Sequence, residues 1–308
     1  MDSSIIVCTH NRCQSLRKTL ASFQDLFLPE GLKCEIIVVD NNSTDDTKQV
    51  VQNFASTSRL PVRYTFERAP GLAHARNRAI QEARGDVLAF IDDDVTVCPT
   101  WLAELKRTFD EQGAACVGGR ILLNENLKLP AWWDTRCDAV LARFDLGDSV
   151  IVAGQDYEGE IGWGANLSFR RSMFERYGHF RTDLGVRPGA RLLCEESEFV
   201  QRLRRNGEVV VYCPGAIAYH FPEVGRISKQ FVRSWYYRLG ESTFVWDSTS
   251  SESSAGIRRV PRWRYRWALM RLWRLFVGEL VRRRREAFIR ELEFFAVLGY
   301  FGRALKGV

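Results

Sequence analysis

The sequence predicts an α/β fold in which a mostly parallel β-sheet is flanked by helices and followed by a helical C-terminal tail. Three observations support this prediction. Short apolar runs alternate with segments of helical periodicity through the first 120 residues. These runs are apolar at nearly every position, as in parallel strands that are covered on both faces. A chain of 308 residues with 27% charged and 45% hydrophobic residues can also bury a sizeable core.

The first half of the chain contains repeated strand and helix signals. The expected strands are residues 4–8, 35–39, 62–66 and 86–91. The expected helices are residues 16–27, 45–54 and 73–83, with a fourth that begins at Pro99. The second of these helices follows the turn residues 41–44, and Gly85 ends the third. Right-handed crossovers between such strands produce a parallel sheet.

Regular alternation weakens after residue 118. A loop is expected around residues 130–133, and strands are expected at 166–169 and 209–212. Helices are expected around Met173 and over residues 195–205. Residues 247–256 are rich in Ser, Thr and Glu and predict a linker. We therefore divide the chain into residues 1–117, residues 118–246, this linker and a tail of residues 257–308.

Charge is distributed unevenly along the chain. Residues 257–308 contain fourteen Arg or Lys against four Glu, so a net charge of +6 for the whole chain leaves −4 for residues 1–256. Apolar residues in the tail recur every three or four positions, among them Trp263, Trp267, Met270 and Trp273, with Arg between them. Such a basic amphipathic helix suits an anionic membrane surface, or it packs its aromatic stripe on the rest of the chain.

Several classes of protein are excluded. No stretch reaches the roughly 18–20 uncharged apolar residues that a membrane span needs. Because Met-Asp-Ser-Ser leads directly into a strand, we expect no signal peptide and a cytoplasmic protein. The eight cysteines form no C-x-x-C pair, so we expect free thiols in a reducing compartment. Neither G-x-G-x-x-G nor G-x-x-x-x-G-K-[ST] occurs, which argues against dinucleotide dehydrogenases and P-loop enzymes.

Polar side chains follow several expected strands. Thr9 and Asn11 follow the first strand, Asp40 the second and Asp92-Asp93-Asp94 the fourth. In an open α/β sheet, ligands bind at the carboxyl ends of the strands. Three adjacent carboxylates repel one another unless a cation offsets them. Alternate residues such as Asp92 and Asp94 can point to one side and hold a divalent ion that also binds phosphates.

These segments carry a resemblance to a known family. The runs at residues 5–12, 35–46, 71–77 and 90–94, with Gly164-Ala-Asn-Leu-Ser-Phe169 and Cys194-Glu-Glu-Ser-Glu-Phe199, resemble family 2 glycosyltransferases. The likeness covers roughly residues 3–245. It implies the GT-A fold, a Rossmann-like α/β architecture, and an inverting enzyme. That enzyme would transfer a sugar from a nucleotide-diphosphate sugar, UDP-linked, to a hydroxyl of a glycan or of a lipid-linked acceptor.

The resemblance also implies roles for residues on the donor side. Thr9 and Asp40 would contact the nucleobase, Arg76 would lie near the base or phosphates, and Asp92 would bind the ribose or sugar. Asp94 and His220 would hold Mn²⁺ or Mg²⁺ that bridges the diphosphate. The remaining candidates for nucleotide-sugar binding are Asn11, Arg12 and Asp93, and those for neutralising the diphosphate are Arg226 and Lys229.

On the acceptor side, Glu196 occupies the position of the general base, where the family usually has Asp. Neighbouring helical residues point about 100° apart, so only one of Glu195 and Glu196 faces the site, and we assign Glu196 as the base. Trp163, Gly164, Asn166 and Glu195 are candidates for acceptor binding. A single carboxylate base without a covalent nucleophile is consistent with inversion at the anomeric carbon.

Two other functions remain as alternatives. A sugar nucleotidyltransferase shares the sheet and the metal carboxylates, but it needs a Gly-rich basic loop where this chain has Thr9-His-Asn-Arg12. A nucleic-acid-binding protein could use the basic tail, but the acidic body and the Trp stripe disfavour it. We therefore expect the tail to attach the enzyme to the inner face of the cell membrane and expect no nucleic-acid partner.

Overall fold

The computed structural model describes the whole chain except residues 155–156, 188, 251–259, 261, 280–283 and 307–308. The chain forms two compact units. The first comprises residues 1–125, 142–182 and 195–222, and the second comprises residues 126–141, 183–194 and 223–308. The second unit therefore takes three segments from the predicted half 118–246, because these segments pack with the C-terminal helices rather than with the sheet.

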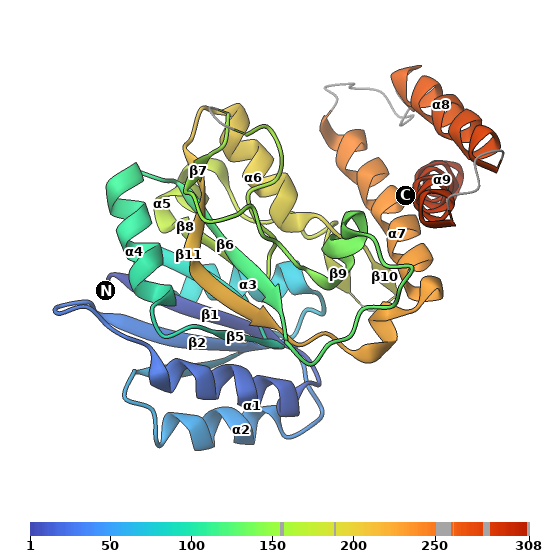
Figure 1. Ribbon diagram of the computed structural model, residues 1–308. Coiled ribbons are helices and arrows are strands. Elements are labelled where there is room, and N and C mark those ends of the chain that lie inside the picture. The colour runs from blue at the N-terminus through green and yellow to red at the C-terminus, as the bar shows by residue number, and fades with distance from the viewer. Residues whose placement is uncertain (155–156, 188, 251–259, 261, 280–283, 307–308) are drawn as a thin grey trace. The chain divides into compact units, whose positions relative to one another are not determined.

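The first unit is built on one sheet, as the sequence predicted (Figure 1). Its strands are β1 (Ser3–Thr9), β2 (Cys34–Asp40), β3 (Val62–Phe66), β4 (Val87–Asp92), β5 (Val95–Val97), β6 (Cys116–Leu123), β7 (Ile151–Val152), β8 (Asn166–Arg170) and β11 (Val210–His220). They lie in the order β3-β2-β1-β4-β8-β6-β11-β5, and β7 pairs with β11. Strands β3, β2, β1 and β4 are parallel, whereas β8 runs antiparallel to both β4 and β6.

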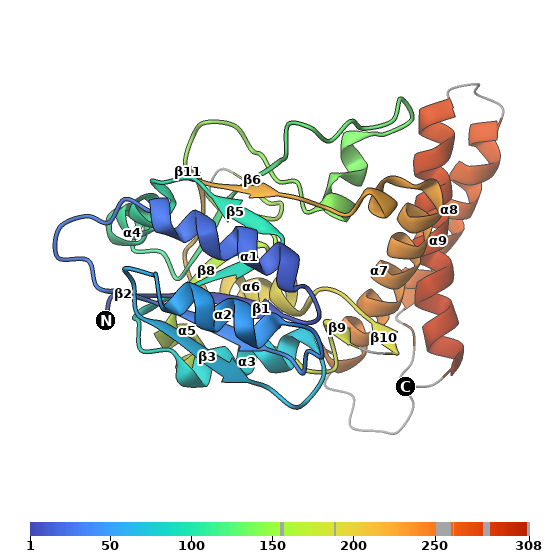
Figure 2. The same ribbon diagram turned by 90° about the horizontal axis from the view of Figure 1, so that it is seen from below.

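Helices cover both faces of this sheet. They are α1 (Cys13–Ser22), α2 (Thr47–Ala55), α3 (Leu72–Glu82), α4 (Trp101–Gln112), α5 (Arg171–Tyr177) and α6 (Glu195–Arg205), with the short helix η1 (Phe23–Asp25). Figures 1 and 2 show α1 and α2 side by side on one face, whereas α3 lies on the other face of β1 and β2. This arrangement explains why β2 is buried at all seven positions. Parallel strands that are covered on both sides need apolar residues at consecutive positions.

A group of aromatic side chains fills the core behind β8. The rings of Phe174 and Phe199 are stacked with centroids 4.6 Å apart, and Phe90, Phe169 and Phe180 meet them edge to face. Edge-to-face and offset contacts between rings add to the hydrophobic stabilisation of such a cluster. The cluster joins β4 and β8 to α5 and α6, and it thereby fixes the first turn of α6.

The register of the parallel strands brings the predicted polar residues together. Thr9 is the direct partner of Asp40 on β2, and Cys8 is the partner of Asp92 on β4. The side chains that follow these strands are therefore delivered to one edge of the sheet.

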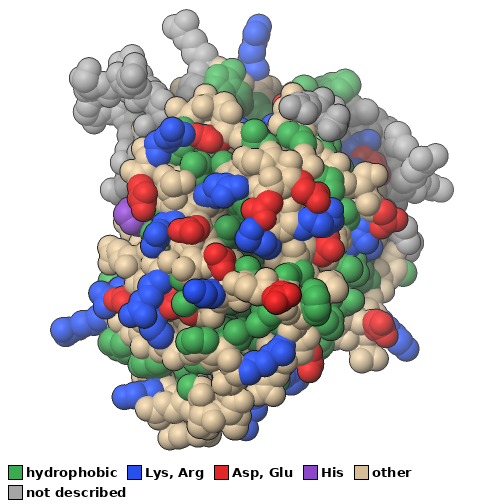
Figure 3. Space-filling view, turned by 90° about the vertical axis from the view of Figure 1, so that its left-hand side faces the viewer, with side chains coloured by type: hydrophobic (Ala, Val, Ile, Leu, Met, Phe, Trp, Pro, Cys, Tyr) green, Lys and Arg blue, Asp and Glu red, His purple; other side chains and the backbone are tan. Residues whose placement is uncertain are grey.

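The surface of the first unit is ordinary for a globular domain. On the face that Figure 3 shows, positive and negative side chains are interspersed between small apolar areas. Helix α4 contributes pairs of this kind, such as Arg107 with Glu104 and Glu111. Exposed pairs of this kind stabilise a helix only slightly.

The second unit is mainly helical. It contains η2 (Thr135–Leu141), β9 (Val186–Arg187), β10 (Ala190–Arg191), η3 (Val224–Ile227), α7 (Lys229–Ser250), α8 (Arg262–Glu279) and α9 (Arg284–Lys306). Helices α7 and α9 approach through glycines. A Cβ atom at Gly240 would overlap the carbonyl oxygen of Ala296, and one at Gly299 would overlap the carbonyl oxygen of Tyr237. Only glycine permits backbones to approach so closely.

The predicted linker is partly helical. Helix α7 continues through Ser250, so the first four residues of the segment 247–256 belong to it, and residues 251–256 lie outside the described residues. Tertiary contacts explain the difference. Asp247 accepts hydrogen bonds from Arg264 of α8 at 2.8 Å and from the hydroxyl of Tyr300 of α9 at 3.0 Å. These contacts stabilise a helix that the polar composition alone disfavours.

The expected helical tail is present as α8 and α9, and its aromatic stripe is divided between two environments. Trp267 is half-buried and meets the ring of Tyr300 edge to face. Trp263, Met270 and Trp273 are instead exposed, by 54%, 49% and 66%. Among the described residues, no helix combines the length and the apolar character needed to cross a membrane. All eight cysteines are free thiols.

Candidate active site

The first part of the candidate site lies where β1 and β2 end. Asp40 is 3% exposed, and its carboxylate accepts hydrogen bonds from the Tyr64 hydroxyl at 2.7 Å and from the Ser43 amide at 2.8 Å. Burial and the Asp40 carboxylate both raise the pKa of Tyr64, which therefore remains a donor. These two bonds fix the carboxylate at the sheet edge. The sequence analysis did not identify Tyr64, because a tyrosine inside a strand has no distinctive pattern.

The loops after β1 and β2 are tied together by Asn11. Its backbone N–H donates a hydrogen bond to the Ser43 hydroxyl oxygen at 2.9 Å, and its side-chain oxygen accepts one from the backbone N–H of Thr44 at 2.7 Å. Asn11 and Asn42 both have positive φ, 52° and 64°, which Asn tolerates better than most residues. Asn11 therefore shapes the loop beside Asp40 as well as being a candidate for donor binding.

Two of the three consecutive aspartates share a cluster with residues from β1 and β11. Thr9 donates a hydrogen bond to Asp93 at 2.7 Å. One nitrogen of Arg12 lies 3.0 Å from Asp93 and 2.8 Å from Asp94. The Nε2 atom of His220 lies 3.2 Å from the other oxygen of Asp94. Burial raises the pKa of Asp93 to about 6, although Arg12 and the Thr9 hydroxyl lower it.

The pair formed by Asp94 and His220 suits a divalent ion that also binds a diphosphate. A carboxylate oxygen and an imidazole nitrogen converge within 3.2 Å, from β11 and from the turn that follows β4. Among the described residues, no group of three or more His, Cys, Asp or Glu side chains could hold a metal ion. Phosphate oxygens and water would therefore supply the other ligands, as they commonly do for Mg²⁺.

Arg76 connects the donor side to the acceptor side. Its guanidinium, only 4% exposed, lies 2.7 Å from Glu195, 3.4 Å from Asp92 and 3.8 Å from Glu196. It also donates to the carbonyl oxygen of Gly164 at 3.2 Å. Burial alone would lower the pKa of Arg76, but the surrounding carboxylates raise it, so this arginine remains charged.

The two glutamates that begin α6 differ in their environments. Glu195 is 3% exposed and pairs with Arg76. Burial, and then the charge of Glu196, raise its pKa to about 8 despite that pair. The side chain of Glu196 is 18% exposed, and its Oε1 accepts the Gly164 amide at 3.3 Å. Of the two carboxylates, Glu196 is therefore the more accessible from outside the protein.

The acceptor-side candidates before Glu195 have different positions. Trp163 is half-buried, donates to the carbonyl oxygen of Arg143 at 3.3 Å and packs edge to face on Phe144. Asn166 is completely buried, and its amide nitrogen donates to the carbonyl oxygens of Arg120 at 3.1 Å and Ala216 at 2.9 Å. Asn166 therefore holds the strands beneath the site rather than facing a ligand.

The two cations predicted to neutralise the diphosphate belong to the second unit. Arg226 lies in η3, and Lys229 begins α7. The Lys229 ammonium stands over the rings of Trp132 and Phe288, at 5.7 Å and 5.0 Å from their centroids. Cation–π contacts of this kind stabilise the helical unit itself. A diphosphate role for these two residues stays a prediction.

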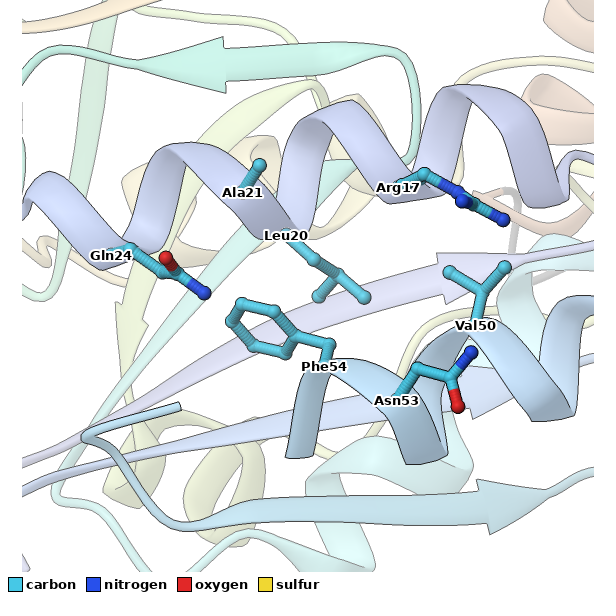
Figure 4. Close-up of a pocket in the computed structure, with 7 residues that line it drawn as sticks. All are labelled: Arg17, Leu20, Ala21, Gln24, Val50, Asn53 and Phe54. Carbon is cyan, nitrogen blue, oxygen red and sulfur yellow. The ribbon is translucent and has the colours of Figure 1, made fainter. Parts of the chain in front are cut away.

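A hollow between α1 and α2 lies apart from these groups (Figure 4). Its lining residues are Arg17, Leu20, Ala21, Gln24, Val50, Asn53 and Phe54. Leu20 and Phe54 face each other across it and pack the two helices together. None of these seven side chains is a carboxylate, so the hollow offers neither a metal ligand nor a general base.

Comparisons with known proteins agree with this fold. The glycosyl transferase family 2 profile matches residues 4–178. The chain is 26% identical over 239 residues to the succinoglycan biosynthesis protein ExoM of Rhizobium meliloti, covering 77% of this chain and 72% of ExoM. It is 34% identical over 123 residues to the GalNAc(5)-diNAcBac-PP-undecaprenol beta-1,3-glucosyltransferase of Campylobacter jejuni, covering 40% of this chain and 38% of that enzyme.

Among solved structures, the mannosyltransferase PcManGT of Pyrobaculum calidifontis, in complex with GDP-Man and Mn²⁺, superposes with a TM-score of 0.68 and 17% identity. The superposition covers 99% of this chain and 88% of that one. The structure of GalNAc-T7 with UDP, GalNAc and Mn²⁺ gives a TM-score of 0.55 at 16% identity. It covers 84% of this chain and 52% of that one. Likeness at these identities establishes the fold.

Proposed function

The chain belongs to glycosyl transferase family 2, and on that premise we propose that it transfers a sugar from a nucleotide-diphosphate sugar to a hydroxyl group with inversion at the anomeric carbon. Glu196 acts as the general base in this proposal. The enzyme class follows from the family; the donor, the metal and the stereochemistry are what the site supports and what experiment must test.

The different environments of Glu195 and Glu196 are the main support for the proposal. Glu195 is buried and contacts Arg76, so the oxygens of Glu195 hold the guanidinium in place. Glu196 is partly accessible, and the Gly164 amide fixes one of its oxygens. An attacking hydroxyl loses its proton as the new bond forms, and a carboxylate within hydrogen-bond reach accepts that proton. No second carboxylate nucleophile is required when attack occurs from the face opposite the leaving group.

The donor would bind along the ends of β1, β2 and β4. The Asp40 carboxylate is held in position by Tyr64 and Ser43 and can accept an N–H group of the base. Uracil and guanine both present such a donor, so the site is compatible with UDP-linked and GDP-linked sugars, and the family resemblance favours the first. Asp92, whose side chain is 36% exposed beside Arg76, is placed to bind a ribose or sugar hydroxyl.

Asp94 and His220 would hold Mn²⁺ or Mg²⁺. When bound, such an ion stabilises the negative charge that develops on the leaving diphosphate. The fold neighbours that contain Mn²⁺ support this choice. The names of ExoM and of the Campylobacter enzyme support a glycan or a lipid-linked acceptor.

We further propose that α8 attaches the protein to an anionic membrane surface on the cytoplasmic side. Trp263, Met270 and Trp273 lie seven and three positions apart on its exposed face, and Arg266 is exposed among them. The sequence from Trp263 to Trp273 contains Arg but no Asp or Glu, and such a face suits the headgroup region of anionic lipids. The other interpretation of the tail, helix packing, describes Trp267, which contacts α9.

The proposal is tested by incubating the purified protein with a panel of UDP- and GDP-sugars, with Mn²⁺ or Mg²⁺, and measuring release of the nucleoside diphosphate. We expect one donor to be hydrolysed slowly without acceptor, and Asp94→Asn to lose this activity. Asp110→Asn, on the exposed face of α4, is the matched control and should retain it. Hydrolysis by Asp94→Asn at the wild-type rate would contradict the assignment of Asp94 to the metal site. Release of pyrophosphate from a nucleoside triphosphate and a sugar phosphate would instead identify a nucleotidyltransferase.

A further inference from the structure

Arg12 occupies a position that a donor-binding role alone does not explain. One guanidinium nitrogen, Nη1, lies 3.0 Å from Asp93 and 2.8 Å from Asp94. The two carboxylates are each 5% exposed, whereas the Arg12 side chain is 27% exposed. The positive charge therefore rests at the opening of a nearly closed acidic site.

The acidic site needs a cation to be stable in the folded protein. Asp93 and Asp94 are adjacent and buried, and buried carboxylates that are not compensated repel one another strongly. Thr9 supplies one hydrogen bond to Asp93, but a hydroxyl carries no charge. Arg12 supplies that charge in the protein without donor.

The two oxygens of the Asp94 carboxylate face different side chains. The Oδ1 atom faces His220 at 3.2 Å, and the Oδ2 atom faces Arg12 at 2.8 Å. One oxygen of the Asp94 carboxylate, Oδ2, is therefore already in contact with a guanidinium, while the other faces His220. A divalent ion and a guanidinium on the same carboxylate repel each other, so the two cations compete for Asp94.

The location of Arg12 allows it to leave. It precedes the first residue of α1 as the N-cap, and its side chain makes no capping hydrogen bond to that helix. It follows Asn11, whose positive φ turns the chain sharply after β1. A long, partly exposed arginine at such a turn can change rotamer without moving the strand. A diphosphate entering at the strand ends offers it a new anionic partner with matching geometry.

We infer that Arg12 is a place-holding cation: it neutralises Asp93 and Asp94 in the donor-free protein and moves to the diphosphate when donor and metal bind together. The inference rests on the proposed function and concerns the order of binding. Its consequence is that Mn²⁺ alone binds weakly, whereas Mn²⁺ and a nucleoside diphosphate bind with positive coupling. Removing Arg12 should strengthen the binding of Mn²⁺ alone and diminish the coupling between Mn²⁺ and the nucleoside diphosphate.

The test measures binding of Mn²⁺ to the full chain by the loss of the EPR signal of free Mn²⁺, without nucleotide and with saturating UDP or GDP. Because the diphosphate itself binds Mn²⁺, the signal with nucleotide is compared with a protein-free sample at the same nucleotide concentration. For Arg12→Gln we expect Mn²⁺ alone to bind about tenfold more tightly than to the wild-type protein, because a neighbouring positive charge is gone. The gain in Mn²⁺ affinity on adding the nucleotide should shrink correspondingly. Arg12→Lys keeps the charge and should resemble the wild type with Mn²⁺ alone.

Arg17→Gln, an exposed arginine on α1, is the matched control and should change neither measurement. Far-UV circular dichroism confirms that each variant is folded. Metal binding by Arg12→Gln that is unchanged or weaker without nucleotide, with unchanged coupling, would overturn the inference and leave the proposed function standing. Failure of the wild-type protein to bind Mn²⁺ with either nucleotide would overturn both.

Discussion

The guanidinium of Arg76 and the carboxylate of Glu195 form an ion pair of 2.7 Å in which both side chains are only 4% exposed. This pair joins α3 to the first turn of α6. A buried charge that loses its partner is strongly destabilising, so each residue holds the other in place. The adjacent Glu196 is the more accessible of the two carboxylates, and it is the general base in our proposal.

The buried position of Glu195 predicts how stability depends on pH. Its pKa is raised from about 4.5 to about 8, first by burial and then by Glu196. Between these values the folded state binds more protons than the unfolded state, so this group lowers the free energy of unfolding as pH rises. Glu195→Gln removes that dependence. In urea unfolding at pH 5 to 8, the variant should gain stability relative to the wild type as pH rises; a constant difference would contradict this assignment.

Cys194, the residue before α6, predicts a stabilising substitution. Its φ is +74°, where a side chain other than glycine is strained. Cys194→Gly should raise the free energy of unfolding by about 0.5–1 kcal/mol, because relief of strain exceeds the entropy that glycine adds to the unfolded chain. Cys98→Gly, whose φ is not positive, should be destabilising. A lower free energy of unfolding for Cys194→Gly than for the wild-type protein, measured in urea, would show that the backbone at Cys194 is not strained.

The close approach of α7 and α9 predicts a severe effect of one methyl group. Gly240→Ala would place a Cβ atom against the carbonyl oxygen of Ala296. We expect a loss of about 1–3 kcal/mol or more, because neither backbone can yield locally. Thermal unfolding by circular dichroism measures it. Gly225→Ala, at a site with open space around the added atom, is the control; equal stability of the two variants would show that the helices do not pack in this way.

If α8 binds a membrane through its exposed face, replacing the aromatic residues on that face should weaken the binding. Trp263→Ser combined with Trp273→Ser should reduce co-sedimentation with phosphatidylglycerol vesicles by at least about tenfold, because two indoles no longer enter the interface. Leu305→Ser, which removes an exposed apolar side chain at the end of α9, should bind as the wild type does. Vesicle binding by the double variant equal to that of the wild-type protein would contradict a lipid partner.

Periodicity and apolar runs were sufficient to predict the main strands and helices of the sheet. The insertion of antiparallel β8 between β4 and β6 could not be predicted, because it depends on packing between residues far apart in sequence. The same applies to residues 247–250. Their Ser-rich composition predicts a linker, but the contacts of Asp247 with Arg264 and Tyr300 make them helical. Local propensity was overridden by tertiary contacts at this point.

The residues of the candidate site that follow the strands were predictable from the sequence, whereas the environments of the other candidate residues were less so. Strand register brings Thr9, Asp40 and Asp92 to one edge, which the sequence order already implied. The amide of Asn166 is instead used inside the sheet, and this follows from its neighbours rather than from its own motif. The difference in burial between Glu195 and Glu196, on which the proposed choice of base depends, is also not revealed by a helical sequence alone.

The most direct test of the account is the rate of sugar transfer by Glu196→Gln, with the donor identified in the hydrolysis panel and binding of that donor measured in parallel. We predict unchanged donor affinity and a fall in transfer of about 100- to 10,000-fold, the range expected when a general base is lost. Asp110→Asn serves as the control and should be fully active. Wild-type transfer by Glu196→Gln would contradict the assignment of Glu196 as the base.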